Sequence, residues 1–355
     1  MFRSFVWGGF EGATQLGVGG RRVDSVAASG HESWAILNHT ILRSLGVRTA
    51  REALRWHLIE RQCGIYDWSS ARAQIAGALH ADTEVIWDIC HWGVPDHLDI
   101  MSPDWVSRLA AFAAAAARML REEGVRIGGW VPINEMAFWA WAGGKKGGFS
   151  PFMFDQGGAL KTQFLRGHLA VVDALRSVGA TEPIVLCEPL IWVVARTGEP
   201  ETAAEARAHV DGAFEAVEWI LERDPKGIDV LGLNYYAHNQ WEVEGVMLLP
   251  SDPRYRPLRD LLADVSARFP LPLAITETGA EEPFGDVWLD QIRHEIADVL
   301  ARKIPLTGVC IYPIMDYPGW DNDRHCPCGA IGHDGGQRFV RAGQRAAIRR
   351  LATSV

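Results

Sequence analysis

The 355-residue sequence has no long apolar run and no run of basic residues. No stretch reaches the length of a membrane span, and residues 110–117 form a helix face flanked by arginines. The amino terminus has no charged segment followed by an apolar one, so we expect no signal peptide. A net charge of −9 without a basic stripe argues against nucleic acid as the partner. Because no stretch is long enough to span a membrane, we expect no membrane partner either.

Cysteine is sparse. Of the six cysteines, Cys90, Cys187 and Cys310 lie in apolar, strand-like runs, where a free thiol behaves as a small hydrophobe. Together with the missing signal peptide, this pattern predicts a reduced, cytoplasmic protein. What the chain does contain is apolar: 48% of its residues are hydrophobic and fifteen are tryptophans. Tryptophan faces offer sugars a flat platform, although core filling explains many of them.

One short segment raises the question of a metal site. His325-Cys326-Pro-Cys328, followed by His333, has cysteine and histidine at a density that can hold zinc. Cys-x-Cys is tighter than the usual Cys-x-x-Cys, however. We therefore favour a pocket-lining loop in which His325 touches a ligand, and we predict no metal and no cofactor.

Apolar runs of strand length alternate with helical patterns along the whole chain. The expected strands are 5–9, 48–56, 84–90, 129–134, 183–187, 229–234, 271–276 and 308–312. The expected helices are 32–45, 102–121, 160–178, 201–221, 258–269, 287–301 and 338–351. Length alone favours two domains, but no linker or low-complexity run divides the chain. The pattern predicts an α/β fold in which residues 1–355 form a single (β/α)₈ TIM barrel.

A doubly wound sheet is the alternative fold, but no glycine-rich phosphate turn follows any strand. In a barrel, the chemistry collects at the carboxyl ends of the strands. Polar and aromatic side chains occupy those positions, which suits a polyhydroxylated ligand. They are Gln15, Arg51, His91, Trp92, Asn134, Glu135, Glu188, Asn234, Tyr236, Glu277 and the segment from Asp316 to Trp320.

Two glutamates, Glu135 and Glu277, end apolar runs that read as buried strands. Burying a charge is costly, so packing alone explains them poorly. One such glutamate would more often belong to a structural ion pair. Two of them on strands four and seven, with Asn134 before one, favour a pair of catalytic acids. Those strands lie on opposite sides of an eight-stranded ring, so the acids can face each other across a sugar.

Hydrolysis of a glycosidic bond needs an acid on the leaving oxygen and a second carboxylate opposite it. At a separation of ~5 to 5.5 Å the second carboxylate is a nucleophile and configuration is retained, whereas at ~6.5 to 9.5 Å it activates water. Arg51 can pair with such a carboxylate, and Tyr236 can hydrogen-bond to it. Trp139 and Trp141 surround Glu135 and would raise its pKa by desolvation, as an acid requires.

The chain resembles glycoside hydrolase family 1, the β-glucosidase family, or a divergent relative in the same clan of retaining barrel enzymes. The motifs run nearly end to end and are specific because they occur together in the right order. They are Phe5-Val-Trp-Gly-Gly-Phe-Glu-Gly-Ala-Thr-Gln15, Arg51-Glu-Ala-Leu-Arg-Trp56, His91-Trp92-Gly-Val-Pro95, Trp130-Val-Pro-Ile-Asn134-Glu135, Asp229-Val-Leu-Gly-Leu-Asn234-Tyr235-Tyr236 and Ile275-Thr276-Glu277-Thr278-Gly279.

The resemblance implies that Glu277 is the nucleophile and Glu135 the acid/base. It implies a substrate site formed by Gln15, Arg51, His91, Trp92, Asn134, Asn234, Tyr236 and Trp320. The chain departs from the family at Met136, where proline is usual, and at Gly319, where a glutamate grips the outer hydroxyls of glucose or galactose. Either Asp321 substitutes for that glutamate, or the sugar is a different one.

These observations predict a retaining β-glycosidase that acts without a cofactor at the non-reducing end of a small-molecule glycoside or oligosaccharide. A transglycosidase would use the same acids. A non-catalytic carbohydrate-binding barrel would not need two acids with Arg51 and Tyr236 beside them. A metal-dependent barrel hydrolase would need several His and Asp residues at the strand ends. The sequence indicates no oligomeric state.

Overall fold

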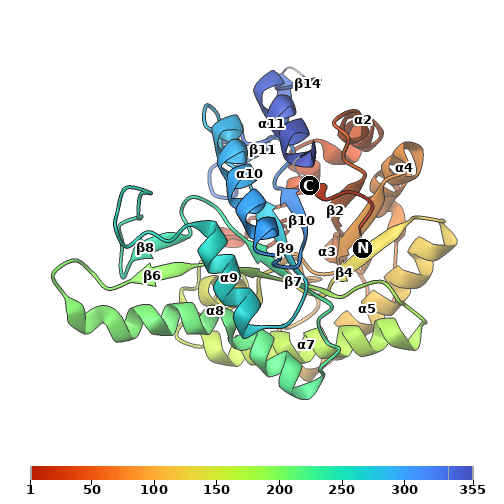
Figure 1. Ribbon diagram of the computed structural model, residues 1–355. Coiled ribbons are helices and arrows are strands. Elements are labelled where there is room, and N and C mark those ends of the chain that lie inside the picture. The colour runs from red at the N-terminus through yellow and green to blue at the C-terminus, as the bar shows by residue number, and fades with distance from the viewer. Residues whose placement is uncertain (1, 335, 354–355) are drawn as a thin grey trace.

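The computed structural model describes residues 2–334 and 336–353, and eight parallel strands form its centre (Figure 1). The strands are β1 (Val6–Gly9), β2 (Thr49–Ala53), β3 (Glu84–Asp88), β4 (Ile127–Val131), β5 (Val185–Pro189), β7 (Val230–Asn234), β9 (Leu273–Thr278) and β10 (Leu306–Ile311). The long helices are α2 (His31–Ser44), α4 (Arg72–Ala81), α5 (Pro103–Glu122), α7 (Gly157–Ser177), α8 (Ala203–Arg223), α9 (Leu258–Arg268), α10 (Gly285–Ala301) and α11 (Ala342–Thr353).

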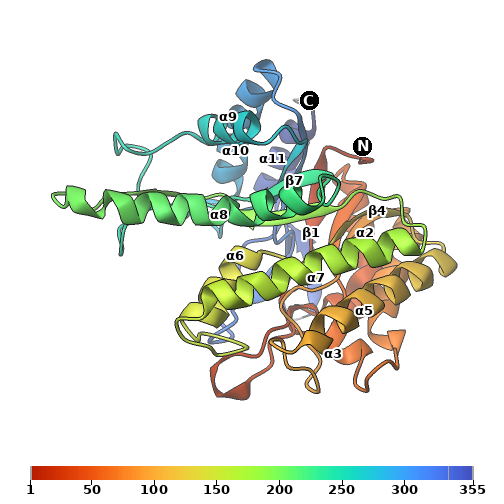
Figure 2. The same ribbon diagram turned by 90° about the horizontal axis from the view of Figure 1, so that it is seen from below.

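The eight strands close into a barrel. They are hydrogen-bonded in the order β4-β3-β2-β1-β10-β9-β7-β5. The two end strands meet through a parallel bridge between Trp130 and Ile184, where the Trp130 N–H donates to the oxygen of Pro183 at 2.9 Å. Helices pack around the outside of this ring (Figures 1 and 2). The chain therefore folds as a (β/α)₈ barrel, as the sequence predicts.

Side chains from the strands alternate between two cores. A small cluster that includes Trp7, Val185 and Cys310 belongs to one face of the strands, and a much larger cluster packs beneath the helices. On β2, this alternation sends Arg51 toward the residues of β3 and β9, and its neighbour Glu52 toward α2. Consecutive residues of one strand thus serve two different sites.

Shorter elements connect and extend the barrel. They are α1 (Ser25–Ala28), α3 (Trp56–Ile59), α6 (Met136–Trp139), η1 (Val18–Gly20), η2 (Trp68–Ala71), η3 (Ala140–Lys145), η4 (Pro200–Thr202), the pair β6 (Trp192–Val194) with β8 (Gln240–Glu242), and the pairs β11 (Tyr317–Pro318) with β12 (His325–Cys326) and β13 (Ile331–Asp334) with β14 (Gln337–Val340). One end of α8 extends well beyond the barrel on the side where β6 and β8 lie (Figure 1). Within residues 2–334 and 336–353, we find no helix with the length and apolar character of a membrane span.

The predicted segments correspond to observed strands and helices with shifts of a few residues, apart from two corrections. The range 48–56 is too long for a strand, because Trp56 begins helix α3 instead. The range 338–351 is wrong at its start, because Arg338 belongs to strand β14 and the helix begins at Ala342. Residues 337–340 form a hairpin with 331–334, and a hairpin partner is not visible in local helical periodicity.

Candidate active site

Arg51 of β2 connects the carboxyl ends of several strands. It is only 1% exposed, and all five of its N–H donors are used. Nε and Nη2 donate to the two carboxylate oxygens of Asp88 at 2.9 and 2.8 Å. Nη1 donates to Glu277 Oε1 at 2.8 Å and to the backbone oxygen of Thr276 at 3.2 Å. The remaining Nη2 donor reaches Asn134 Oδ1 at 2.7 Å, so one guanidinium fixes both the carboxylate of β9 and the amide after β4.

Glu277 lies near the end of β9 and is 6% exposed. Its Oε1 pairs with Arg51, and its Oε2 accepts a hydrogen bond from the Tyr236 hydroxyl at 2.9 Å. Burial and the negative charge of Glu277 raise the pKa of Tyr236, so the hydroxyl keeps its proton and remains a donor. The two carboxylate oxygens of Glu277 are therefore held in place by one donor from β2 and one from the segment that follows β7.

Glu135 follows β4 in a left-handed backbone conformation, with φ 45° and ψ 61°. A non-glycine residue rarely adopts this conformation without a tertiary reason. Its Oε1 accepts a hydrogen bond from Asn234 Nδ2 at 2.9 Å, and Asn234 Oδ1 in turn accepts one from the Thr276 hydroxyl at 2.7 Å. Asn234 thus links Glu135 to β9, where Glu277 is the register partner of Asn234.

The surroundings of Glu135 favour its protonated form. Burial raises the pKa of this carboxyl well above its usual value, and the charges of Glu277 and Glu188 raise it further. The hydrogen bond from Asn234 and the charge of Arg51 act in the opposite direction but do not cancel the shift. One acid of the pair is therefore held protonated, while the other is bonded to a cation.

His91 and Trp92 hold the segment around Asn134. His91 Nδ1 lies 2.9 Å from Asp88 Oδ2, and its Nε2 lies 3.1 Å from Asn134 Nδ2. Because Asp88 is acceptor-only when ionised, Nδ1 carries the proton and Nε2 accepts. Burial would raise the pKa of Asp88, but Arg51 and His91 outweigh it and lower that pKa. The indole N–H of Trp92 donates to the backbone oxygen of Asn134 at 2.9 Å.

Gln15 and Trp320 also lie in the region of His91 and Trp92, and each has a polar side-chain atom without a hydrogen-bond partner among the described residues. Gln15 is 3% exposed, and Trp320 packs edge-on against Trp92 at a centroid distance of 5.2 Å. Within the described part of the chain, neither Gln15 Oε1 nor Trp320 Nε1 has a hydrogen-bond partner. Buried polar atoms of this kind normally have partners, so these two are available to a bound hydroxyl group.

Two further residues of this region were not identified from the sequence as site residues. Glu11 follows β1 and is 6% exposed, and its Oε1 accepts from the Ala13 N–H at 2.9 Å and from the Tyr312 hydroxyl at 3.5 Å. Tyr312 follows β10, and its ring lies 5.2 Å from the guanidinium carbon of Arg51. Burial raises the pKa of Glu11, and the charge of Glu277 contributes to the rise. The sequence signal that could have identified Glu11 is its place two residues after the end of the first strand.

Glu188, also expected at a strand end, lies on β5 and is fully buried. Its Oε2 accepts a hydrogen bond from the Ala137 N–H at 3.0 Å, while Oε1 has no hydrogen-bond partner among the described residues. Burial raises its pKa to about 7, although backbone N–H groups and Lys161 oppose the rise. Glu188 therefore supports the backbone of the segment that carries Glu135.

The described histidine and cysteine side chains of the late segment contact other groups of the protein. His325 Nε2 lies 3.3 Å from Asp316 Oδ2, and Arg341 binds both oxygens of Asp316. The Cys328 thiol contacts the backbone oxygen of Cys326 at 3.4 Å. In residues 2–334 and 336–353, these side chains do not belong to any group of three or more His, Cys, Asp or Glu residues whose ligand atoms all lie within 4.8 Å of one another. Asp321, considered as a substitute for the glutamate missing at Gly319, is exposed.

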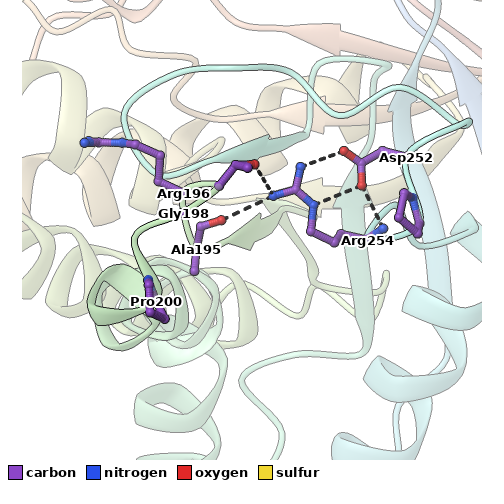
Figure 3. Close-up of a pocket in the computed structure, with 8 residues that line it drawn as sticks. Ala195, Arg196, Gly198, Pro200, Asp252 and Arg254 are labelled. Carbon is purple, nitrogen blue, oxygen red and sulfur yellow. Dashed lines mark hydrogen bonds and ion pairs between the residues drawn. The ribbon is translucent and has the colours of Figure 1, made fainter.

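A separate hollow of about 490 Å³ lies between the segment after β6 and the loop after β8. It is lined by residues 195–198, 200 and 252–254, so it contains none of the expected site residues. Figure 3 shows Arg254 between Ala195 and Asp252. Arg254 pairs with Asp252 and Glu242, and Arg196 pairs with Glu199 and Glu244. Since both guanidinium groups are neutralised, the described residues that line the hollow offer no free cation to an anionic ligand.

Comparison with solved structures finds other proteins that have this fold. No protein-family model matches the chain, and no curated protein matches it. A β-glucosidase from Thermotoga maritima in complex with glucoimidazole superposes with a TM-score of 0.80 at 18% identity, over 98% of each chain. The deoxynojirimycin complex of the same enzyme gives 0.81 at 16% identity, over 100% of this chain and 99% of the other. The AHE enzyme from Alicyclobacillus herbarius gives 0.78 at 19% identity, over 100% and 98%. At these identities the likeness establishes the fold.

Proposed function

We propose that this protein is a retaining β-glycosidase, in which residues 1–355 form one catalytic barrel. The observation that carries the proposal is that two neighbouring glutamates, Glu135 and Glu277, lie in different electrostatic surroundings. Glu277 is ion-paired with Arg51 and bonded to Tyr236, whereas Glu135 has a pKa well above its usual value. A carboxylate and a carboxylic acid at the carboxyl ends of two different strands of one barrel are the two groups that glycoside hydrolysis needs. The superposition with β-glucosidases supports the same function.

In the first step, Glu277 attacks the anomeric carbon while the bond from that carbon to the leaving oxygen breaks. Glu135 gives its proton to the leaving oxygen, so the alcohol departs neutral. The sugar is then esterified to Glu277. Arg51 and Tyr236 orient the attacking carboxylate, because each holds one of its two oxygens.

In the second step, Glu135 is a carboxylate and takes a proton from water. The water oxygen attacks the anomeric carbon from the face that the alcohol left, and the ester bond to Glu277 breaks. The two inversions together retain the β configuration. Asn234 stays bonded to Glu135 and stabilises its ionised form in this step, because it donates to Oε1.

The glycone site is proposed from the polar atoms without a protein partner. Gln15 Oε1 accepts from sugar hydroxyls, and the indole N–H of Trp320 donates to them, with Trp92 packed behind it. Asn134 Nδ2 uses one hydrogen on His91 and keeps one for the substrate. Both ring nitrogens of His91 already take part in hydrogen bonds, one to Asp88 and one to Asn134. His91 can therefore bind a sugar hydroxyl only if that hydroxyl replaces one of these two partners.

The proposal is tested with nitrophenyl glycosides of the gluco, galacto, fuco, manno and xylo series in both anomers. We expect release from at least one β-glycoside, with β-configured sugar as the first product in ¹H NMR before mutarotation. Glu277→Ala and Glu135→Ala should lose at least about 10³-fold in kcat/KM with the natural type of leaving group. Glu188→Gln, a change of another buried strand-end glutamate that takes no part in either step, is the matched control and should lose far less in kcat/KM than the two alanine variants. An α-configured first product, or full activity in Glu277→Ala, would refute the mechanism.

A further inference from the structure

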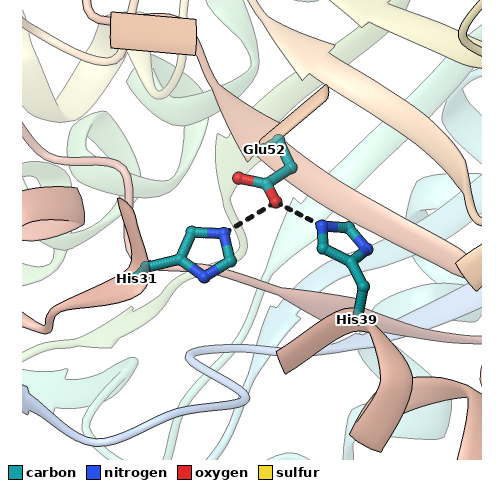
Figure 4. A group of neighbouring side chains, drawn as sticks. All are labelled: His31, His39 and Glu52. Atoms are coloured by element: carbon teal, nitrogen blue, oxygen red, sulfur yellow. Dashed lines mark hydrogen bonds and ion pairs between the residues drawn. The ribbon is translucent and has the colours of Figure 1, made fainter. Parts of the chain in front are cut away.

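A buried group of two histidines and one glutamate lies on the outer side of β2. His31 Nε2 and His39 Nε2 each lie 2.9 Å from the same oxygen, Glu52 Oε1. Figure 4 shows that both rings turn their Nε2 edges toward this oxygen. The three donor atoms lie within 4.8 Å of one another, and none of the three side chains is more than 1% exposed.

The neighbours of this group fix the rings in place. Phe10 stacks on His31 at a centroid distance of 3.8 Å, and Asn38 contacts His31 Nδ1 through Nδ2 at 2.9 Å. Helix α4 approaches so closely that a Cβ on Gly77 would lie 2.6 Å from His39 Cδ2. Gln74 of the same helix donates to Glu52 Oε2 at 2.7 Å. The arrangement is therefore set by three elements, β2, α2 and α4.

The charge of this group is not balanced by a permanent cation. The hydrogen bonds of Glu52 in the described residues come from two imidazoles and one amide, with no Arg or Lys among these partners. A carboxylate oxygen and the unprotonated nitrogen of a neutral imidazole are the forms of these side chains that bind a metal ion.

Several polar atoms of the group have no partner. Gln74 Oε1, Asn38 Oδ1 and His39 Nδ1 are buried, and no hydrogen bond to them is found in the described structure. Turning the Asn38 amide by 180° lets its Oδ1 accept from His31 Nδ1–H, which leaves a lone pair on His31 Nε2. A ring held through Nδ1–H in this way presents Nε2 to a metal, as metal-binding histidines usually do.

We propose that His31, His39 and Glu52 bind one Zn²⁺ ion that fastens helix α2 to strand β2. Two imidazole nitrogens and a carboxylate oxygen form a donor set suited to Zn²⁺, and the buried amide oxygen of Gln74 is the candidate for the fourth position. The ion has a structural task, because all three ligands are closed off from solvent. The site lies on the opposite side of β2 from Arg51 and does not depend on the proposed glycosidase activity.

A second convergent group, Glu60 with Cys63 and His97, is a weaker candidate. The guanidinium of Arg108 already binds Glu60 Oε1, and the indole of Trp56 donates to Oε2 at 2.8 Å. A metal ion would have to displace the arginine. This group therefore serves as an internal control for metal binding by the first one.

The proposal is tested by the metal content of the purified full-length chain, produced without a histidine tag in zinc-supplemented medium. We expect close to one zinc per chain by inductively coupled plasma mass spectrometry. Removal with dipicolinate in mild denaturant should lower Tm by at least about 5 °C, and Zn²⁺ should restore it. Less than about 0.1 metal per chain, with no Tm response to Zn²⁺ on refolding, would overturn the site. Another first-row metal at one per chain would overturn the zinc assignment.

Variants and NMR distinguish a metal site from a hydrogen-bonded cluster. Glu52→Gln and His39→Gln should abolish stoichiometric zinc, whereas His97→Ala in the control group should keep it. In the wild type, ¹⁵N spectra should show His31 and His39 protonated at Nδ1 and not at Nε2. If the variants fail to fold, the tautomers of His31 and His39 in the wild type still distinguish a metal site from a hydrogen-bonded cluster. Protons on both Nε2 atoms would mean that the rings only donate hydrogen bonds to Glu52.

Discussion

At the scale of residues, the two acids differ because their neighbours differ. Glu277 has an arginine on one oxygen and a tyrosine hydroxyl on the other. Glu135 receives one neutral amide donor and is close enough to Glu277 for that charge to raise its pKa. An electrostatic coupling of this kind separates an acid from a nucleophile without any difference in residue type.

This coupling predicts that Glu277→Gln lowers the pKa of Glu135, since the substitution removes a negative charge that favours the proton. The pKa is measured by ¹³C NMR titration of carboxyl-labelled glutamate. Glu188→Gln should lower the same pKa by a smaller amount, because Glu188 contributes less to the shift than Glu277 does. An unchanged Glu135 titration in Glu277→Gln would show that the acids are not coupled.

Glu188 predicts a pH-dependent cost in stability. Its pKa rises from 4.5 to about 7 on folding, so the folded protein holds a proton that the unfolded chain releases. Below pH 4.5 both states are protonated and the residue has no effect. As pH rises to 7 the folded state loses roughly 3 kcal/mol relative to the unfolded state, and this loss persists at higher pH.

Glu188→Gln should therefore be more stable than the wild type at pH 8 by a few kcal/mol at most, and little changed at pH 4.5. Urea denaturation at both values measures the difference. A gain that is the same at both pH values would mean that packing, and not the buried carboxyl, is responsible.

At the scale of elements, α2 and α4 pack through a glycine. A Cβ at Gly77 would lie 2.6 Å from His39 Cδ2 and 2.8 Å from the backbone oxygen of Ala35, so Gly77→Ala must push the helices apart. We expect a loss of about 1 to 3 kcal/mol in the free energy of unfolding.

Gly212→Ala is the matched control, because that helical glycine has nothing within 4 Å of a new Cβ. The control should gain about 0.5 to 1 kcal/mol. Equal effects of the two substitutions in thermal denaturation would contradict the packing argument.

The elements themselves were largely predictable, because a strand buried on both faces reads as a short apolar run and a helix as a 3.6-residue period. The strand predicted over 229–234 is observed at 230–234, and the helix over 258–269 at 258–268. The segment 338–351 failed because a β-hairpin depends on pairing with residues 331–334, which no local pattern shows. Trp56 was assigned to a strand because an aromatic residue suits a strand as well as a helix.

Which side chains contact one another in the candidate site was harder to predict. Glu277, Arg51 and Tyr236 were expected near one another from their places at strand ends, and the structure brings them into direct contact. Glu11 was overlooked, although it lies inside the motif from Phe5 to Gln15, because a single acid between Phe10 and Gly12 does not by itself indicate a site residue. The contact of Glu52 with two residues of α2 was equally invisible, because it depends on how the helix is rotated against the strand.

At the scale of the whole molecule, the barrel explains why residues as far as 301 positions apart in the sequence meet at one place. Parallel strands in a ring present their carboxyl ends on one side, so Arg51 and Glu277 approach from separate strands. The fold thereby sets the geometry in which the proposed chemistry takes place. Its large apolar core and buried Arg51 network hold that geometry rigid before any substrate binds.

The most direct test of this account is the configuration of the azide adduct formed by two variants. With a β-glycoside that has a reactive leaving group, Glu277→Ala plus azide should give the α-glycosyl azide, because azide attacks from the side of the missing nucleophile. Glu135→Ala plus azide should give the β-glycosyl azide, because the glycosyl-Glu277 ester still forms and azide replaces water. The reverse assignment, or the same anomer from both variants, would contradict Glu277 as nucleophile and Glu135 as acid/base.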